Sequence, residues 1–123
     1  MSKSYDLGKL GEEIACARLR AEGCTIRETR WRFRHLELDI IADDGTNLII
    51  AEVKTRSSLA GGLPEDAIDY KKIMRIVRAA DTYIRMNYID LPYRFDIFSI
   101  IIGKDGTPGE VTHLKDAFYP PLG

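Results

Sequence analysis

The spacing of hydrophobic residues changes several times along the chain, and each change predicts a different element. Over residues 6–22 apolar residues recur every three or four positions, which indicates an amphipathic helix that stops at Gly23. Residues 24–34, 36–42 and 47–54 instead show the alternating or continuous apolar runs of strands. Asp44-Gly45 lies between the last two strands, and this dipeptide is a strong signal for a hairpin.

The second half of the chain predicts a long helix between two further groups of strands. Residues 57–63 are expected to form a loop, and the helix is predicted from Pro64, which suits a first turn, to about Asn87. A buried strand over 94–102, a turn over 104–107 and a short edge strand over 110–114 follow, and 115–123 are expected to be a loose tail. The predicted fold is one α/β domain over residues 1–123, ordered α-β-β-β-α-β-β, with a mixed central sheet flanked by helices.

Composition and charge restrict the possible functions only slightly. The chain has 123 residues, 45% of them hydrophobic, and a net charge of −1, so any contact with nucleic acid depends on local patches. Neither a membrane-length apolar run nor a secretory leader is present, and the cytoplasm is the expected location, with no membrane partner. Cys16 and Cys24 are then expected to be free thiols, and His35 and His113 to be surface or packing residues.

Four charged residues lie inside the two apolar strands of the hairpin, namely Glu37, Asp39, Glu52 and Lys54. If Asp44-Gly45 forms a two-residue turn, residue 41 pairs with 48, 39 with 50 and 37 with 52. Because side chains alternate between the faces of a strand, these charged groups then share one face, with Asp39 diagonal to Glu52. A slip of one residue would place them on opposite faces.

Carboxylates that share a face repel one another unless a cation lies between them. Lys54 supplies one positive charge, and an oxygen-only ligand set favours a hard divalent ion such as Mg²⁺ or Mn²⁺. Such an ion is suited to phosphate chemistry, and a neighbouring lysine can orient water or neutralise developing charge. A solvated salt bridge between Glu52 and Lys54 is the alternative interpretation of the same residues.

The motif around these residues resembles a known class of nuclease. Asp39, followed after an apolar strand by Glu52-Val53-Lys54, resembles the PD-(D/E)XK signature of restriction-endonuclease-like nucleases. Further blocks between residues 8 and 102 are similar to the YraN family, a bacterial family of small predicted endonucleases that resembles archaeal Holliday-junction resolvases. These blocks are Gly8-Lys9-Leu10-Gly11-Glu12, Glu37-Leu38-Asp39, Glu52-Val53-Lys54-Thr55-Arg56, Pro64-Glu65-Asp66-Ala67 with Lys71, and Arg94-Phe95-Asp96.

The resemblance implies a restriction-endonuclease-like core, α-β-β-β-α-β, and a divalent-metal-dependent DNA endonuclease that hydrolyses phosphodiester bonds. Asp39 and Glu52 would be metal ligands together with the Val53 carbonyl, and Lys54 would be the catalytic lysine. Glu12 would complete the catalytic group through a metal-bound water. The cofactor would be Mg²⁺ or Mn²⁺.

Two glycines and one leucine add detail to the resemblance. Gly8 and Gly11 are costly inside a helix, which suggests that the hairpin or DNA approaches the first turns closely. Leu36 stands where the family usually has glycine before the glutamate, so the local backbone geometry is expected to differ here.

Basic residues indicate where a nucleic acid would bind. Arginines alternate with Trp31 and Phe33 along 27–34, and further basic residues follow the long helix. Solvated arginines and a core tryptophan are the alternative. The candidate contacts are Arg30, Arg32, Arg34, Arg56 and Lys71. Because no base-reading motif is evident, the expected partner is DNA recognised by structure, including branched DNA, and analogy with branched substrates suggests a homodimer.

Two other function classes remain open at this stage. The chain could be a non-catalytic module that binds nucleic acid or a partner protein and keeps the nuclease fold. It could also be a small phosphoesterase, although no glycine-rich phosphate loop is apparent. The intact Asp39, Glu52 and Lys54 favour the nuclease.

Overall fold

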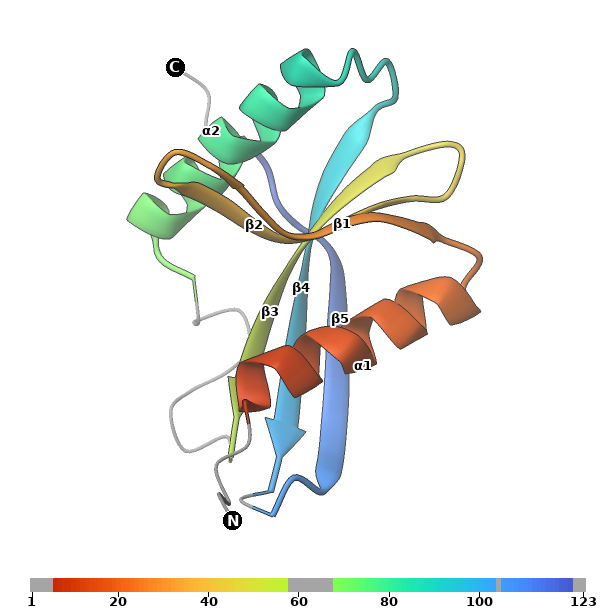
Figure 1. Ribbon diagram of the computed structural model, residues 1–123, viewed down its shortest axis with the longest axis vertical. Coiled ribbons are helices and arrows are strands. Elements are labelled where there is room, and N and C mark those ends of the chain that lie inside the picture. Colours follow the sequence, from red (N-terminus) through yellow and green to blue (C-terminus); the bar gives the residue numbers. More distant parts are fainter. Residues whose placement is uncertain (1–5, 58–67, 104, 121–123) are drawn as a thin grey trace.

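The computed structural model describes residues 6–57, 68–103 and 105–120, and within them the predicted order α-β-β-β-α-β-β is confirmed. One five-stranded sheet has the order β1-β2-β3-β4-β5 (Figure 1). The β3–β4 pair is parallel and the other neighbours are antiparallel, so the sheet is mixed as expected. The elements are α1 (Leu7–Ala21), β1 (Thr25–Phe33), β2 (Leu36–Asp43), β3 (Leu48–Arg56), α2 (Tyr70–Met86), β4 (Tyr93–Ile102) and β5 (Pro108–Phe118).

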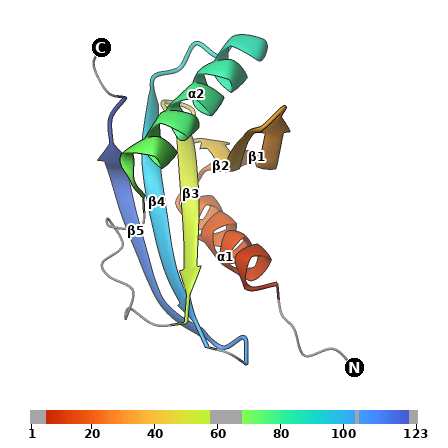
Figure 2. The same cartoon turned by 90° about the vertical axis from the view of Figure 1, so that its left-hand side faces the viewer.

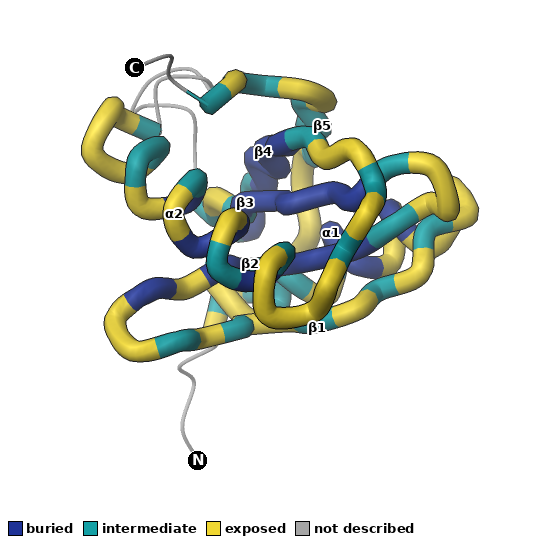
Figure 3. Tube along the Cα trace, turned by 90° about the horizontal axis from the view of Figure 1, so that it is seen from above, coloured by how far each residue is buried: buried dark blue, intermediate teal, exposed yellow. Residues whose placement is uncertain are grey.

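The two helices pack on opposite faces of the sheet (Figure 2). One core cluster joins α1 to the sheet through residues such as Leu19, Ile49 and Phe98. The other joins α2 to the sheet through residues such as Ile50 and Tyr83. Figure 3 shows that burial is concentrated along β2, β3 and β4, whereas the outer surfaces of both helices are exposed. No helix in the described part of the chain is long and apolar enough to cross a membrane.

An aspartate begins each helix. Asp6 accepts a hydrogen bond from the Lys9 N–H at 3.0 Å, and Asp69 accepts one from the Lys72 N–H at 2.8 Å. The predicted start of the second helix was therefore too early, because Asp69 caps a helix that begins at Tyr70. Residues 58–67, which include most of the predicted loop and the Pro64 block, lie outside the described residues.

The last strand is longer than predicted. β5 covers Pro108–Phe118, so residues 115–118 belong to the sheet and not to a loose tail. Two contacts explain the extension. The N–H of Asp116, which has φ of 54°, donates to Asp96 at 3.0 Å across a bulge, and Phe118 stacks on Phe95 with ring centroids 4.8 Å apart. These contacts continue the pairing past an irregularity that local sequence does not reveal.

Asp96 organises the neighbouring end of the sheet. It is fully buried and binds the Arg94 guanidinium through both oxygens, at 3.0 and 3.2 Å. His113 Nε2 lies 2.7 Å from Asp96 Oδ2, and its ring stacks on Phe98. Burial acts to raise the pKa of Asp96, but these hydrogen bonds outweigh it and lower the pKa. His113 is thus a packing residue, and Cys16 and Cys24 are free thiols, as predicted.

The hairpin between β2 and β3 has a wider loop than the sequence suggested. Asp43 pairs with Leu48, and the Asp44 side chain accepts hydrogen bonds from the N–H groups of Thr46 and Asn47 at 2.9 and 2.7 Å. The two-residue turn is therefore wrong, because the Asp44 carboxylate builds a loop over residues 44–47. The pairing moves by two positions, and an even shift leaves the predicted faces of the paired residues, 40–43 and 48–51, unchanged.

Candidate active site

Strands β2 and β3 separate at the acidic residues. Their pairing continues from the loop to Ile40 and Ala51 and does not extend further. Ile40 packs under α1, whereas Leu38 and Leu36 pack in the core under α2. Regular alternation would keep all three on one face, so β2 turns toward α2 around Asp39. Leu36 is 8% exposed and fills this part of the core, which gives the residue a packing role.

The two acidic side chains occupy the opening between the strands. Asp39 Oδ2 accepts the Val53 N–H at 2.8 Å, and Glu52 Oε2 accepts the Asp39 N–H at 3.3 Å. Asp39 and Glu52 are the residues next to the last pair, Ile40 and Ala51, so they face each other across the opening, where the prediction had them diagonal. Because the N–H and C=O of a strand residue point the same way, the Val53 carbonyl also faces this opening. Asp39, Glu52 and the Val53 carbonyl therefore bring oxygen donors together.

Burial raises the free energy needed to ionise both carboxyl groups of this pair. Glu52 is only 5% exposed, and burial, followed by the nearby Asp39 carboxylate, raises its pKa to about 8. Burial likewise raises the pKa of Asp39, although the Val53 N–H opposes this change. The Lys72 amine, 3.9 Å from Glu52 Oε1, supplies one positive charge against two carboxylates. Largely buried oxygen ligands whose negative charge exceeds the positive charge beside them fit a hard divalent ion.

A divalent ion held by these protein oxygens would keep several coordination positions for water or substrate. Within residues 6–57, 68–103 and 105–120, no group of three or more His, Cys, Asp or Glu side chains is placed to hold a metal. The protein ligands would thus be the two carboxylates and the Val53 carbonyl. Magnesium sites commonly combine one or two carboxylates with waters and phosphate oxygens, so this incomplete set suits phosphate chemistry.

Glu12 lies behind the pair, on α1. Its charge contributes to the raised pKa of Asp39, and its Oε1 accepts from Arg30 Nε at 2.8 Å. Helix α1 reaches this position because Gly11 has no side chain: a Cβ there would overlap Thr55 Oγ1 on β3. Close approach at Gly11 is therefore confirmed, whereas at Gly8 the nearest atom to a Cβ is Oδ1 of the α1 N-cap, Asp6, at an ordinary contact distance.

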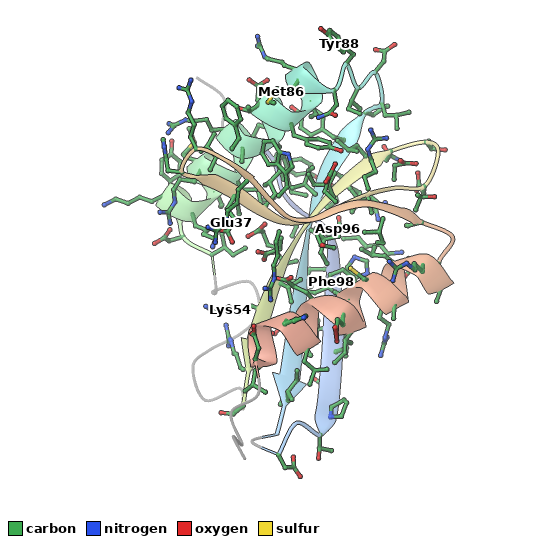
Figure 4. The ribbon with its side chains drawn as sticks, viewed as in Figure 1. Glu37, Lys54, Met86, Tyr88, Asp96 and Phe98 are labelled. Atoms are coloured by element: carbon green, nitrogen blue, oxygen red, sulfur yellow. The ribbon has the colours of Figure 1, made fainter. Side chains whose placement is uncertain are left out.

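Two adjoining pockets surround Glu52. One, of about 190 Å³, is lined by Glu37, Asp39 and Glu52 among others, and the second, of about 200 Å³, is lined by Glu52 and Lys54. Figure 4 shows Glu37 near β2 and Lys54 near the lower part of β3, both on the side where α2 begins. The four charged residues of the hairpin therefore line adjoining pockets, although the bend at Asp39 breaks the alternation from which a shared face was predicted for Glu37. Lys54 is exposed, and Arg56 is half-buried at the end of the same strand.

Comparison with known proteins places the chain in a family. Residues 11–100, which include Glu12, Asp39, Glu52 and Lys54, match the uncharacterised protein family UPF0102. The chain belongs to this family. UPF0102 proteins of Bacteroides thetaiotaomicron and Bacteroides fragilis are 48% and 51% identical to it over 122 residues, 99% of each chain. A UPF0102 protein of Flavobacterium psychrophilum is 41% identical over 119 residues, covering 97% of this chain and 98% of that one. The resemblance to the YraN family is thereby confirmed.

In this UPF0102 chain, Lys72 is the site residue that sequence reasoning missed. Its Nζ lies 3.9 Å from Glu52 Oε1, and Lys72 lines both pockets together with Arg75. The predicted contact, Lys71, lines a different hollow on the outer side of α2. Helical spacing carried a usable signal, because Lys72 precedes the buried Ile76 by four residues and therefore extends the inner stripe toward the sheet.

The arginines of β1 in the UPF0102 chain, and Arg34 just after it, have partners within the protein. Arg30, besides its bond to Glu12, lies 3.7 Å from Asp6. Arg32 pairs with Glu37 at 3.4 Å, and Arg34 lies over the Phe33 ring at 5.3 Å from its centroid. Trp31 meets the buried Tyr83 edge-on, which supports the core interpretation of this residue. The predicted nucleic-acid face is thus largely occupied by internal contacts.

Proposed function

We propose that this UPF0102 protein is a divalent-metal-dependent endonuclease that hydrolyses phosphodiester bonds in DNA. The observation that carries the proposal is the carboxyl pair of the half-buried Asp39 and the buried Glu52, held across the opening between β2 and β3. A purely structural role does not account for two acids whose pKa values are both raised by burial. Their pockets open beside the exposed amine of Lys54, where a phosphate has access.

Each residue has a defined task in this proposal. Asp39, Glu52 and the Val53 carbonyl would hold Mg²⁺ or Mn²⁺, which supplies charge stabilisation and lowers the pKa of a coordinated water. The Lys54 amine orients the attacking water or balances charge that develops on the phosphate. Lys72, 3.9 Å from Glu52, lowers the electrostatic cost of ionising that carboxyl. Glu12 positions water from the α1 side.

Cleavage of labelled DNA tests the proposal directly. Single-stranded, duplex, flap and four-way-junction DNA should be incubated with Mg²⁺ or Mn²⁺ and the wild-type protein, Glu52→Gln or Lys54→Met. Glu22→Gln is the matched control, because Glu22 is an acid that pairs with Lys115 at 2.9 Å, remote from the pockets. Metal-dependent cutting that both site variants lose and the control keeps supports a nuclease. Wild-type protein that binds DNA without cutting it supports the non-catalytic module instead.

Metal binding needs a variant that leaves the strands intact. Asp39→Ala would also remove the acceptor of the Val53 N–H, whereas Asp39→Asn keeps an oxygen at that position. Calorimetric titration of Mg²⁺ and Mn²⁺ should therefore compare wild-type protein with Asp39→Asn. We expect at least a tenfold weaker affinity in the variant, since loss of a charged ligand commonly costs more than about 1.4 kcal/mol. Equal affinities would exclude Asp39 from the ligands.

A further inference from the structure

We propose that the exposed face of α2 carries a nucleic-acid strand into the site and that Tyr70 stacks on an unpaired base of that strand. The inference rests on the proposed nuclease function and specifies its substrate, which would have unpaired nucleotides beside the bond to be cut. Four observations carry it: a basic stripe, its continuity with the site pockets, an exposed aromatic ring, and the contrast with β1.

The basic stripe follows from the spacing of residues along α2. Lys71, Arg75 and Arg78 are separated by four and three positions, so they lie on one side of the helix, and all three are exposed. The buried residues of α2 lie on its other side and hold the helix against the sheet; they are Ile76, Ala79, Ala80 and Tyr83. The helix is thus anchored by one face and presents positive charge on the other.

This stripe is continuous with the candidate active site. A hollow of about 420 Å³ on the outside of α2 is lined by Tyr70, Lys71, Arg75 and Arg78 among others. Arg75 also lines both pockets at Glu52, so one side chain joins all three hollows. At a rise of 1.5 Å per residue the stripe is about 10.5 Å long, which is enough to contact more than one phosphate of a strand.

Tyr70 offers a surface that bases recognise. It is 65% exposed in the first turn of α2, next to Lys71 and within the same hollow. An aromatic ring beside phosphate-binding cations is the arrangement by which proteins hold single strands, since every base has a face that can stack. Bases inside a duplex are already covered on both faces. A ring in this position therefore favours an unpaired nucleotide over a continuous duplex.

Among the residues that the structure describes, the basic side chains on the exposed face of α2 are free to contact a nucleic acid, whereas those of β1 are engaged in ion pairs. Within the described parts of the chain, Lys71, Arg75 and Arg78 form no ion pair, whereas Arg30 and Arg32 do. Asp69, which precedes α2, is directed to the helix backbone as its cap, and Asp81, the acid within α2, pairs with Arg85 at 3.0 Å. The structure thus moves the nucleic-acid surface from β1 to α2.

Binding without divalent metal tests the role of Tyr70 separately from cleavage. Fluorescence anisotropy should compare single-stranded, flap and blunt duplex DNA for wild type, Tyr70→Ala and Tyr70→Phe. Tyr88→Ala is the matched control, because Tyr88 is a 92% exposed tyrosine just beyond the other end of α2. We expect Tyr70→Ala to weaken single-strand and flap binding by roughly 5- to 150-fold. Tyr70→Phe, Tyr88→Ala and duplex binding should stay close to wild type.

The salt dependence of binding tests the basic stripe. Arg78→Gln should lower the slope of log affinity against log salt by about 0.7 on single strands. Arg85→Gln should leave it unchanged, because Arg85 pairs with Asp81 at 3.0 Å further along the helix. Folding of each variant is checked by thermal denaturation.

Several results would overturn the inference and leave the nuclease proposal to its own test. These are equal losses on duplex and single strands, no loss in Tyr70→Ala, or wild-type protein that binds none of the DNAs. Conversely, DNA binding could depend on Tyr70 and Arg78 while no metal-dependent cutting is observed. That result would contradict the nuclease proposal and support the binding surface.

Discussion

Replacing Glu52 with glutamine should stabilise the protein, and the gain should grow as pH rises. Burial and the Asp39 carboxylate raise the pKa of Glu52 from 4.5 to about 8. Between these values the folded protein holds a proton that the unfolded chain has released, so wild-type stability falls as pH increases. The amide of glutamine has nearly the same shape and can still accept the Asp39 N–H, yet it carries no charge to desolvate.

The magnitude follows from the size of the pKa change. At about 1.4 kcal/mol per pKa unit, a rise from 4.5 to about 8 corresponds to roughly 5 kcal/mol as an upper limit. Rearrangement around an ionised carboxylate reduces this cost, so we expect a difference of about 2–4 kcal/mol to develop across that range. Above about pH 8 the difference should become constant.

Urea denaturation of the wild type and Glu52→Gln, in the presence of a metal chelator and at intervals from about pH 5 to about pH 9, measures this difference in the free energy of unfolding. Glu22→Gln is the control, because the hydrogen bond from Lys115 lowers the pKa of Glu22 and gives glutamine no advantage there. Adding Mg²⁺ at the alkaline end should stabilise the wild type and leave Glu52→Gln almost unchanged. A difference between wild type and variant that does not change with pH would refute the assigned environment of Glu52.

Two further predictions concern packing away from the pockets. Gly11→Ala should destabilise the protein by about 1–3 kcal/mol through overlap with Thr55, whereas Gly8→Ala should be neutral or stabilising by up to about 1 kcal/mol; thermal denaturation distinguishes them. Asp96→Asn should cost about 3–5 kcal/mol in urea denaturation, because it leaves the Arg94 guanidinium without its buried partner. Since the pKa of Asp96 is lowered, wild-type stability should fall as pH drops below 3.8. If Asp96→Asn showed the same loss of stability in acid, Asp96 would not be the ionised partner described here.

Local pattern was sufficient to predict the elements of this protein. Hydrophobic period, glycine and proline positions and the Asp-Gly dipeptide predicted the order α-β-β-β-α-β-β, because these features act within a few residues. The prediction failed for two different reasons. The start of α2 was missed although its signal is local, because Asp69 caps the helix through the Lys72 N–H three residues later. The extension of β5 depends on a long-range contact, the bond from the Asp116 N–H to Asp96. The prediction that Asp39 and Glu52 share a face holds although the predicted turn was wrong. The pairing was in error by two positions, and a shift by an even number of positions keeps a residue on the same face.

The sequence by itself therefore determined the elements, the family and the acidic residues that share a face. Tertiary structure decided which other residues join them. Packing of α2 placed Lys72, and not Lys71, at the pockets, and the four-residue loop after Asp43 set the register that brings Asp39 and Glu52 to face each other. Internal partners on β1 and exposed charges on α2 moved the proposed binding surface. The physical reason is that strand curvature and the partners of exposed charges are set by packing against the whole sheet, which no short segment encodes.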